Sequence, residues 1–199
     1  MKVGILGGSF DPIHNGHLLM AQYAIEELQL DQVIFLPTFK PPHKMGDKLS
    51  KFSDRVNMLE LAFDKREDFV LSTLESERPG LGYTYDSLKI FAKKYPGAEL
   101  FFLIGSDSLM YIEKWYRSED LLREFFFGVA PRPGRSKKEL EATINRLAVD
   151  YGAKIYLLDS PYIEISSTGL RQRVKEARPL KYHLPESVEE YIYEQMLYK

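Results

Sequence analysis

The sequence predicts an α/β protein whose parallel sheet is doubly wound, with helices on both faces. Short apolar segments alternate with longer amphipathic ones along the chain, a pattern typical of consecutive βαβ units. Several apolar segments, of which 100–104 is the clearest, contain no polar residue, as expected for strands buried on both faces of a parallel sheet. The fold is therefore expected to be Rossmann-like.

Each apolar segment is a predicted strand, and each amphipathic one a predicted helix. Segments 125–130 and 154–158 repeat the fully buried strand pattern of 100–104. Ser53 is the expected cap of the second helix. The predicted strands are 3–6, 33–36, 69–71, 100–104, 125–130 and 154–158. The predicted helices are 18–28, 53–63, 85–95, 137–151, 168–176 and 185–197.

Composition limits the classes of function. A chain of 199 residues fits one domain, 1–199, with a C-terminal helical part from about residue 166 to 199. The net charge of −2 provides no general attraction to nucleic acid or to an anionic membrane, so any anion site must be local. The chain has no cysteine, and no apolar run or leader suggests a membrane or export segment. We expect a cytoplasmic protein without nucleic-acid or membrane partners.

The stretch from residue 7 to 17 is expected to hold an anion. Gly7 and Gly8 follow the first predicted strand, and they have no Cβ to keep a ligand from their backbone N–H groups. The helix that follows aims free N–H groups and its positive dipole end at the same place. His14 and His17 are three residues apart, so one helical turn brings both imidazoles toward the anion. The pattern predicts a bound phosphate chain.

An ordinary βα turn with two surface histidines fits this stretch less well, because turn glycines are common but rarely carry paired histidines. Zinc-binding histidines on a helix are usually four apart, and no cysteine or acidic third ligand is obvious nearby. Gly4, Gly7 and Gly8 do not have the G-x-G-x-x-G spacing of a dinucleotide fingerprint. A Walker loop requires G-K-S/T, which the sequence lacks here. Phosphate binding with two histidines as donors is therefore favoured.

The motif H-N-G-H at residues 14–17 resembles the H-x-G-H signature of the nucleotidyltransferase superfamily. The string G-G-S-F-D-P at 7–12 is similar to one branch, the bacterial nicotinate-nucleotide adenylyltransferases. Two later segments resemble the other motifs of this family in the same order, so the resemblance extends from residue 7 to 171. It implies that the histidines act in catalysis and that the first turn binds ATP through Gly7, Gly8, Ser9 and Phe10.

A second glycine turn follows the predicted strand 100–104. Gly105 permits close backbone approach, and Ser106 and Asp107 are short polar residues suited to cap a helix. A plain helix cap explains the turn equally well on local grounds. Ligands of open α/β sheets bind beyond the carboxyl ends of strands, however, and both glycine turns lie at such ends. With K-W-Y at 114–116, the turn resembles the family's second motif, which places Gly105 and Asp107 at ATP.

Trp115 is the only tryptophan, and two interpretations of it stay open. Single tryptophans are usually core or amphipathic surface residues, but the polar and charged neighbours of Trp115 disfavour full burial. The resemblance implies that its indole stacks on the nicotinate ring, opposite Thr84 and backbone N–H groups that receive the ring carboxylate. Ser87 stands where the family commonly has threonine, and it keeps the hydroxyl. The residues thus placed at nicotinate mononucleotide are Tyr83, Thr84, Tyr85, Lys114, Trp115 and Tyr116.

The third segment, I-S-S-T-G-L-R at residues 165–171, opens a predicted helix. Serine and threonine at a helix start present hydroxyls and free N–H groups to an anion. Arg171 lies one turn further, where its guanidinium suits bidentate contact with phosphate. An ordinary helix cap with a solvated arginine is the alternative. The segment resembles the superfamily's I-S-S-T-x-x-R motif, which places Ser167 and Thr168 at ATP and gives Arg171 a catalytic role.

Further cations are expected to serve the triphosphate. Lys40, His43 and Lys44 lie in a proline-containing loop at 37–50, and Arg132 and Arg135 follow another strand end. Each alone is explained as a solvated surface charge. Lys44 and Arg132 are the preferred candidates, Lys44 for catalysis and Arg132 for ATP binding, because a triphosphate needs several cations. The loop length and its prolines suit a lid over the site.

The reaction implied by the resemblance joins ATP and nicotinate mononucleotide into nicotinate adenine dinucleotide and pyrophosphate, a step of NAD biosynthesis. Mg²⁺ is expected to arrive with ATP, since no dedicated carboxylate cage is visible. The alternatives are the same chemistry on nicotinamide mononucleotide or phosphopantetheine, a cytidylyl transfer, and a non-catalytic nucleotide sensor with this fold. A homodimer or higher homo-oligomer stays open, because the tyrosine-rich segment 182–198 suits a core and an interface equally.

Overall fold

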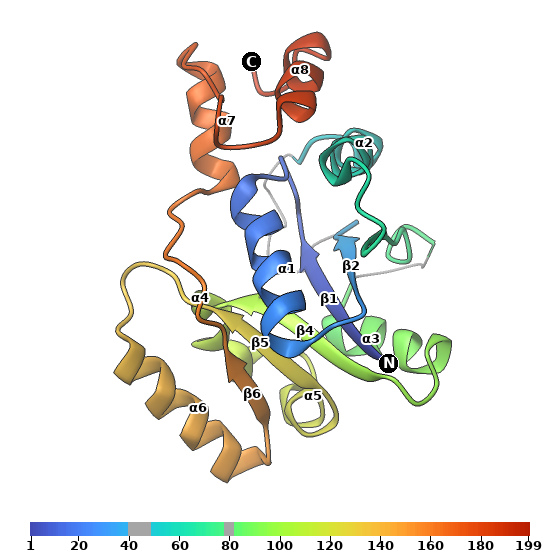
Figure 1. Ribbon diagram of the computed structural model, residues 1–199, viewed down its shortest axis with the longest axis vertical. Coiled ribbons are helices and arrows are strands. Elements are labelled where there is room, and N and C mark those ends of the chain that lie inside the picture. The colour runs from blue at the N-terminus through green and yellow to red at the C-terminus, as the bar shows by residue number, and fades with distance from the viewer. Residues whose placement is uncertain (40–48, 78–81) are drawn as a thin grey trace.

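The computed structural model describes residues 1–39, 49–77 and 82–199. Within them, six strands form one sheet in the order β3-β2-β1-β4-β5-β6 (Figure 1). All neighbouring strands are parallel, as the alternating sequence pattern predicts. The six predicted strands are all present, with ends that differ by no more than two residues. They are β1 (Lys2–Gly8), β2 (Gln32–Pro37), β3 (Phe69–Leu71), β4 (Glu99–Gly105), β5 (Phe126–Ala130) and β6 (Lys154–Leu157).

Helices cover both faces of the sheet, which confirms the predicted doubly wound architecture. The longer helices are α1 (Asn15–Leu28), α2 (Phe52–Phe63), α3 (Thr84–Lys94), α6 (Lys137–Tyr151), α7 (Ser167–Lys175) and α8 (Glu186–Glu194). Three short ones lie between β4 and β5, namely α4 (Ser106–Leu109), the 3₁₀ helix η1 (Ile112–Lys114) and α5 (Ser118–Glu124). A helix was expected after Gly105, but no bounds were predicted for any of these three, because each is too short to show a helical period.

Two apolar cores lie on opposite sides of the sheet because successive strand residues point to opposite faces. On β4, Phe101 and Leu103 belong to the core formed with α1, α2, α7 and α8. Phe102 and Ile104 belong to the second core, formed with α3, α5 and α6. The C-terminal helices α7 and α8 therefore pack into the same core as the first two helices.

The strand order reverses between β1 and β4. The chain moves outward in one direction from β1 to β2 and β3, and in the other from β4 to β5 and β6 (Figure 1). The glycines at the carboxyl end of β1 lie beside the carboxyl end of β4, because Leu6 pairs with Leu103 in register. This switch point is where doubly wound sheets open a crevice for ligands.

The C-terminal helices sit above the α2 end of the molecule (Figure 1). Helix α8 is tied to α2 by hydrogen bonds from Ser187 Oγ to the Leu61 carbonyl and from Tyr191 to Asp54. The chain then turns back, and the hydroxyl of Tyr198 donates to Asp11 Oδ1 at 2.6 Å. The C-terminal tail thus contacts the segment that follows the first glycine turn.

Three local predictions were wrong. Lys51, not Ser53, is the N-cap of α2, where Ser50 instead makes tertiary contacts with Asp11 and Arg55. Neither Ser106 nor Asp107 caps α4: the cap is Gly105, and Ser106 Oγ accepts the backbone N–H of Arg132. Strand β6 is not buried on both faces, because it is an edge strand with β5 as its neighbour.

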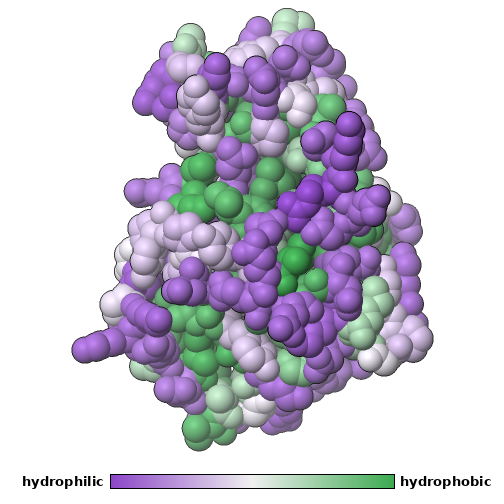
Figure 2. All heavy atoms as spheres, in the orientation of Figure 1, coloured by the Kyte–Doolittle hydropathy of each residue, from purple (hydrophilic) through white to green (hydrophobic). Residues whose placement is uncertain are grey.

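Hydrophilic residues surround the rim of the face that carries α1, and hydrophobic residues gather in its middle, below the C-terminal helices (Figure 2). Large exposed apolar side chains such as Val149 and Tyr182 occur on the surface, and single residues of this kind are ordinary there. Among the described residues, none of the helices has the length and apolar character needed to cross a bilayer.

Candidate active site

The first glycine turn leads from β1 to α1 at the switch point. A Cβ on Gly8 would lie 3.2 Å from the ring of Phe10, so a side chain there would press on that ring. Phe10 has a left-handed backbone with φ of 46°. Its side chain is buried, with its ring centroid 5.0 Å from that of His17 and 5.8 Å from that of Phe35. The Phe10 side chain thus supports His17 from the core, which leaves only its backbone for the predicted contact with ATP.

A buried arginine braces this turn. Arg55, from α2, donates from Nη1 to the carbonyls of Ser9 at 2.7 Å and Thr38 at 2.8 Å, and from Nε to that of Ser50 at 3.3 Å. This residue was not predicted from the sequence. The sequence feature that indicates its role is a charged residue on an otherwise apolar helix face. Arg55 shares the buried side of α2 with Met58 and Leu59.

The two histidines lie together at the start of α1, where His14 is the N-cap. Their rings stack with centroids 3.7 Å apart. The backbone N–H of His14 donates to Nδ1 of His17 at 3.3 Å. In a neutral imidazole this leaves the proton on Nε2, so Nε2 of His17 is a donor.

Both imidazoles are neutral at neutral pH. Burial, followed by the positive charge of Arg132, lowers the pKa of His14 to about 4. Burial, followed by His14 and Arg132, lowers the pKa of His17 well below its usual value. Nδ1 of His14 is buried and has no hydrogen-bond partner among the described residues. Such an orphaned polar atom is costly unless a ligand or water meets it.

The third sequence segment docks on the first. Ser166 Oγ caps α7 by accepting the Gly169 N–H, so an ordinary cap explains Ser166. A helix cap does not explain Ser167, because its Oγ donates to the Pro12 carbonyl at 2.8 Å, in the first sequence segment. Arg171 donates to the Asp11 carbonyl at 2.8 Å and to Thr168 Oγ1 at 3.2 Å. Residues 155 or more positions apart in the chain thus form one polar cluster around the glycine turn.

The second glycine turn lies beside a cation. A Cβ on Gly105 would lie 2.8 Å from Nε of Arg132, so glycine leaves the space that this guanidinium occupies. Arg132 Nη1 is 3.9 Å from Asp107 Oδ2. Arg132 and His14 line the same small hollow, together with Ser160, Pro161, Ile163 and Ile165. Asp107, Arg132 and His14 are therefore brought together as predicted, although this proximity does not by itself test a role in ATP binding.

A larger cavity of about 320 Å³ opens on the other side of the first turn. Its walls come from β1, from the start of α3 and from the segment after η1, so that it directly adjoins the first glycine turn. The Tyr83 and Tyr116 rings lie 4.5 Å apart at its side. Ser87 Oγ is buried in it without a hydrogen-bond partner among the described residues. The lining includes Gly7, Gly8, Ser9, Thr38, Glu75, Gly82, Tyr83, Thr84, Ser87, Phe102, Trp115 and Tyr116.

Two residues predicted to contact the mononucleotide point elsewhere. The side chain of Tyr85 is buried in the core behind α3, and its hydroxyl donates to Glu124 Oε1 at 2.9 Å. Lys114 lies outside the cavity lining, with its ammonium 5.3 Å from the centre of the Tyr111 ring. The helical period explains why Tyr85 points into the core, because α3 buries Tyr85, Leu88 and Phe91 on one face. The predicted catalytic Lys44 lies outside the described residues.

The cavity also contains a carboxylate that was not predicted from the sequence. Glu75 is buried, lines the cavity, and accepts the Phe39 N–H at 3.1 Å. A Cβ on Gly82 would collide with the Glu75 carboxylate, so a side chain there would require that carboxylate to move. No local pattern around Glu75 signals this, because the contact joins segments brought together by the fold.

No group of three or more histidine, cysteine or acidic side chains suited to a metal ion occurs within residues 1–39, 49–77 and 82–199. The expectation that the metal comes with the nucleotide is not tested by this, since Mg²⁺ often binds through substrate phosphates and keeps several waters. The donors that converge on the turn are histidine, arginine, hydroxyl and backbone N–H groups, and all of these suit phosphate oxygens.

Known proteins have similar sequences and a similar fold. Residues 5–173 match the cytidylyltransferase-like family model. The chain is 42% identical to a probable nicotinate-nucleotide adenylyltransferase of Exiguobacterium sibiricum, over all of this chain and 99% of the relative. It is 38% identical to the nicotinate-nucleotide adenylyltransferase of Bacillus subtilis, over all of this chain and 98% of that protein.

The structure of Plasmodium falciparum nicotinic acid mononucleotide adenylyltransferase complexed with NaAD has a similar fold. The TM-score is 0.82 at 23% identity, and the match covers 99% of this chain and 97% of that chain. The identity is too low for this likeness to carry more than the fold. The family model covers most of the chain, and the relatives match it over its full length. This chain is therefore a nucleotidyltransferase of the cytidylyltransferase-like family and belongs to the nicotinate-nucleotide adenylyltransferases.

Proposed function

We propose that the protein transfers the adenylyl group of ATP to nicotinate mononucleotide and releases pyrophosphate, with each substrate held in its own half of the site. One observation carries this division. The turn Gly7–Gly8–Ser9 borders the large cavity, and the side chains of His17, Ser167 and Arg171 gather around the same turn. A mononucleotide whose ring lies in the cavity has its phosphate at the turn, next to the α-phosphate of ATP.

The chemical step is an in-line displacement. A phosphate oxygen of the mononucleotide attacks the α-phosphorus of ATP and forms the new P–O bond. The bond from that phosphorus to the bridging oxygen of the β-phosphate breaks, and its electron pair leaves with pyrophosphate. A phosphate monoester is already an anionic nucleophile, so the step needs no general base. Catalysis then consists of positioning both reactants and stabilising charge on the transferred and leaving phosphates.

The histidines serve as uncharged donors in this proposal. Nε2–H of His17 is directed to the transferring phosphate, because Nδ1 already accepts a backbone N–H. His14 donates to the neighbouring phosphate, and its orphaned nitrogen supports a ligand that completes the site. Positive charge comes from Arg132 and Arg171. Arg171 is held at its place by Asp11 and Thr168 while N–H groups of its guanidinium remain for phosphate oxygens.

The ring of the mononucleotide occupies the large cavity. Thr84, at the first position of α3, offers its hydroxyl and helix-start N–H groups to the ring carboxylate. Trp115 and the Tyr83–Tyr116 pair provide aromatic faces. The unpartnered Ser87 hydroxyl supports a polar ligand group at that depth. Lys44, although outside the described residues, stays a proposed partner of the leaving pyrophosphate.

A divalent metal fits this site as part of the ATP complex. Enzymes of this kind typically use one, and we propose Mg²⁺ bound to the triphosphate oxygens. Its contribution is to neutralise charge on the phosphates as the leaving group departs. Asp11 accepts hydrogen bonds from the Ser50 N–H and from Tyr198, and Asp107 Oδ2 lies 3.9 Å from Arg132 Nη1. In this proposal the residues of the chain bind the phosphates, and the metal ion is bound by the phosphates.

Pyrophosphate release tests the proposal. Purified protein is incubated with ATP and Mg²⁺ together with either nicotinate or nicotinamide mononucleotide. We expect much faster release with nicotinate mononucleotide, with nicotinate adenine dinucleotide as the second product. Release only with the amide would keep the displacement but refute the carboxylate site at Thr84. Absence of release with both would refute the proposed substrate pair.

A further inference from the structure

Trp115 and Tyr116, which line the mononucleotide cavity, lie in a stretch with little regular structure. This wall segment, residues 110–118, contains the short helix η1 and no strand, and its last residue, Ser118, begins α5. Its backbone is held internally by bonds such as Trp115 N–H to the Ile112 carbonyl at 3.0 Å. Buried Ile112 anchors it from below. Trp115 is half-buried and packs edge-on against Phe102 of the core, with the ring centroids 6.1 Å apart. Because its other side is exposed, contacts that hold the wall segment from outside also bear on its orientation.

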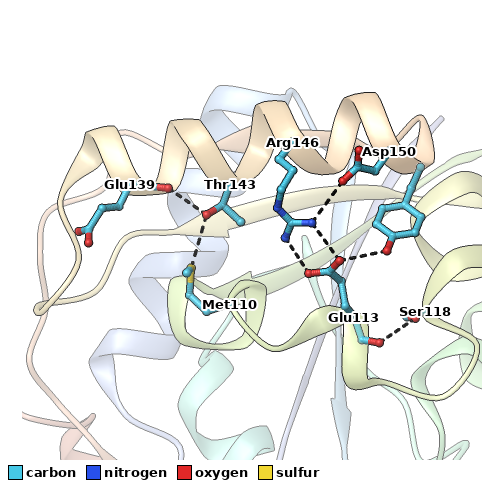
Figure 3. A network of polar contacts seen from close by, with 8 residues as sticks. Met110, Glu113, Ser118, Glu139, Thr143, Arg146 and Asp150 are labelled. Atoms are coloured by element: carbon cyan, nitrogen blue, oxygen red, sulfur yellow. Dashed lines mark hydrogen bonds and ion pairs between the residues drawn. The ribbon is translucent and has the colours of Figure 1, made fainter.

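Glu113 provides that outer attachment (Figure 3). Its carboxylate accepts Arg146 Nη1 at 3.0 Å and Nη2 at 2.6 Å, in a bidentate pair. The hydroxyl of Tyr151 donates to the same carboxylate at 3.0 Å. Arg146 is held in turn by Asp150, at 3.4 Å. A carboxylate with three donors in fixed geometry is held more firmly than in a simple surface ion pair.

Helix α6 is a rigid support for these donors. Ser136 and Glu139 form a reciprocal capping box at its start, and Gly152 closes its end in the left-handed conformation. Thr143 Oγ1 adds a second contact to the wall segment, at 3.8 Å from the sulfur of Met110 (Figure 3). Within the wall segment, Ser118 Oγ donates to the Glu113 carbonyl at 3.0 Å, so Glu113 is held at its backbone as well.

We propose that the Glu113–Arg146 pair, with Tyr151, is a positioning clamp that sets the wall of the mononucleotide cavity through Trp115 and Tyr116. Neither Glu113 nor Arg146 lines the cavity, so both act through the wall segment. The clamp rests on the proposed function, because it assigns these residues to affinity for the mononucleotide. The clamp is expected to affect binding of the mononucleotide alone, since the donors around the first glycine turn come from other elements.

The Arg146→Met variant tests the clamp, with Arg66→Met as its matched control. Arg66 makes a bidentate pair with Asp68 of similar exposure, away from the cavity. Loss of the clamp is expected to raise KM for nicotinate mononucleotide by about 5- to 10-fold. The kcat value and KM for ATP are expected to stay within about twofold. Arg66→Met is expected to leave all three constants unchanged.

Trp115 provides a readout that needs no substrate. Because it is the only tryptophan, selective excitation reports on the wall segment alone. Arg146→Met is expected to shift its emission toward that of a more solvated indole, and Arg146→Lys, which keeps the charge but not the fork, to give an intermediate shift. Unchanged emission together with an unchanged mononucleotide KM would overturn the clamp. A wild-type protein inactive with nicotinate mononucleotide would instead refute the proposed function, while the emission would still test the clamp.

Discussion

The two halves of the site are held in different ways. Around the first glycine turn, called here the phosphate turn, groups from distant parts of the chain hold the backbone or Asp11. They are Arg55 from α2, Ser167 and Arg171 from α7, and Tyr198 from the C-terminal tail. The mononucleotide cavity is bounded by aromatic rings on the half-exposed wall segment, which an ion pair attaches to α6. In the proposed division of the site, the chemistry lies in a cluster tied to the core, and substrate recognition lies in a wall segment attached through half-exposed contacts. The two halves should respond differently to mutation.

The largest expected effect lies in the phosphate half. His17→Ala removes a preorganised donor to the transferring phosphate, and we expect kcat to fall by about 10²- to 10³-fold. KM for the mononucleotide should change little, because its ring lies in the other half. Steady-state pyrophosphate release measures this, with His183→Ala as control, since His183 belongs to neither half. Near-normal turnover in His17→Ala would contradict the assigned role.

Arg55→Met tests how firmly the phosphate turn is braced. The substitution leaves the carbonyls of Ser9, Thr38 and Ser50 without their shared donor. We expect the free energy of unfolding to fall by about 3 kcal/mol. Urea denaturation checks this against Arg66→Met, which removes an exposed pair and should cost less than about 1 kcal/mol. Equal losses in the two variants would show that the buried brace is not special.

The histidines should make the protein less stable in mild acid. His14 has a pKa of about 4 in the folded protein, against an ordinary value of 6.5, so between these pH values the unfolded chain binds the additional proton. Stability therefore falls as the pH drops from 6.5 to 4, by about 3 kcal/mol from His14. Urea denaturation over this range should show a weaker pH dependence for His14→Asn. An identical dependence in variant and wild type would contradict the buried neutral state.

Ser87→Ala is expected to give the smallest effect and to separate binding from folding in the cavity. The hydroxyl has no described protein partner, so its loss should leave stability unchanged or raise it by up to about 1 kcal/mol. KM for nicotinate mononucleotide should rise by a few-fold if a ligand atom meets the hydroxyl. Parallel thermal melts and kinetics check both numbers. Lower stability with an unchanged KM would make Ser87 a purely structural residue.

Much of the fold follows from local sequence patterns. The strands were predicted because parallel strands buried on both faces are uniformly apolar, as in β4. Helix α6 was predicted with the observed ends because its cap, its period and Gly152 agree. Ser53 and β6 show where local pattern fails. The start of α2 depends on contacts of Ser50, and the exposure of β6 depends on its place at the edge of the sheet.

The site divides in the same way. Motif residues that act through a local turn, such as His14 and His17, are placed by their spacing. Residues that serve the site from the core are not: Arg55, Glu75 and Tyr198 come from separate elements and meet only in three dimensions. Tyr85 shows the opposite error, because its neighbour Thr84 lines the cavity while the next position on α3 points into the core.

Binding of each substrate alone, followed by Trp115 fluorescence, tests the division of the site most directly. Nicotinate mononucleotide is titrated into wild-type protein, and a non-hydrolysable ATP analogue with Mg²⁺ is titrated in parallel. The account predicts saturable quenching by the mononucleotide, because its ring stacks near the indole, and little change with the ATP analogue. Quenching by the ATP analogue with no response to the mononucleotide would contradict the assignment of the two substrates to their halves.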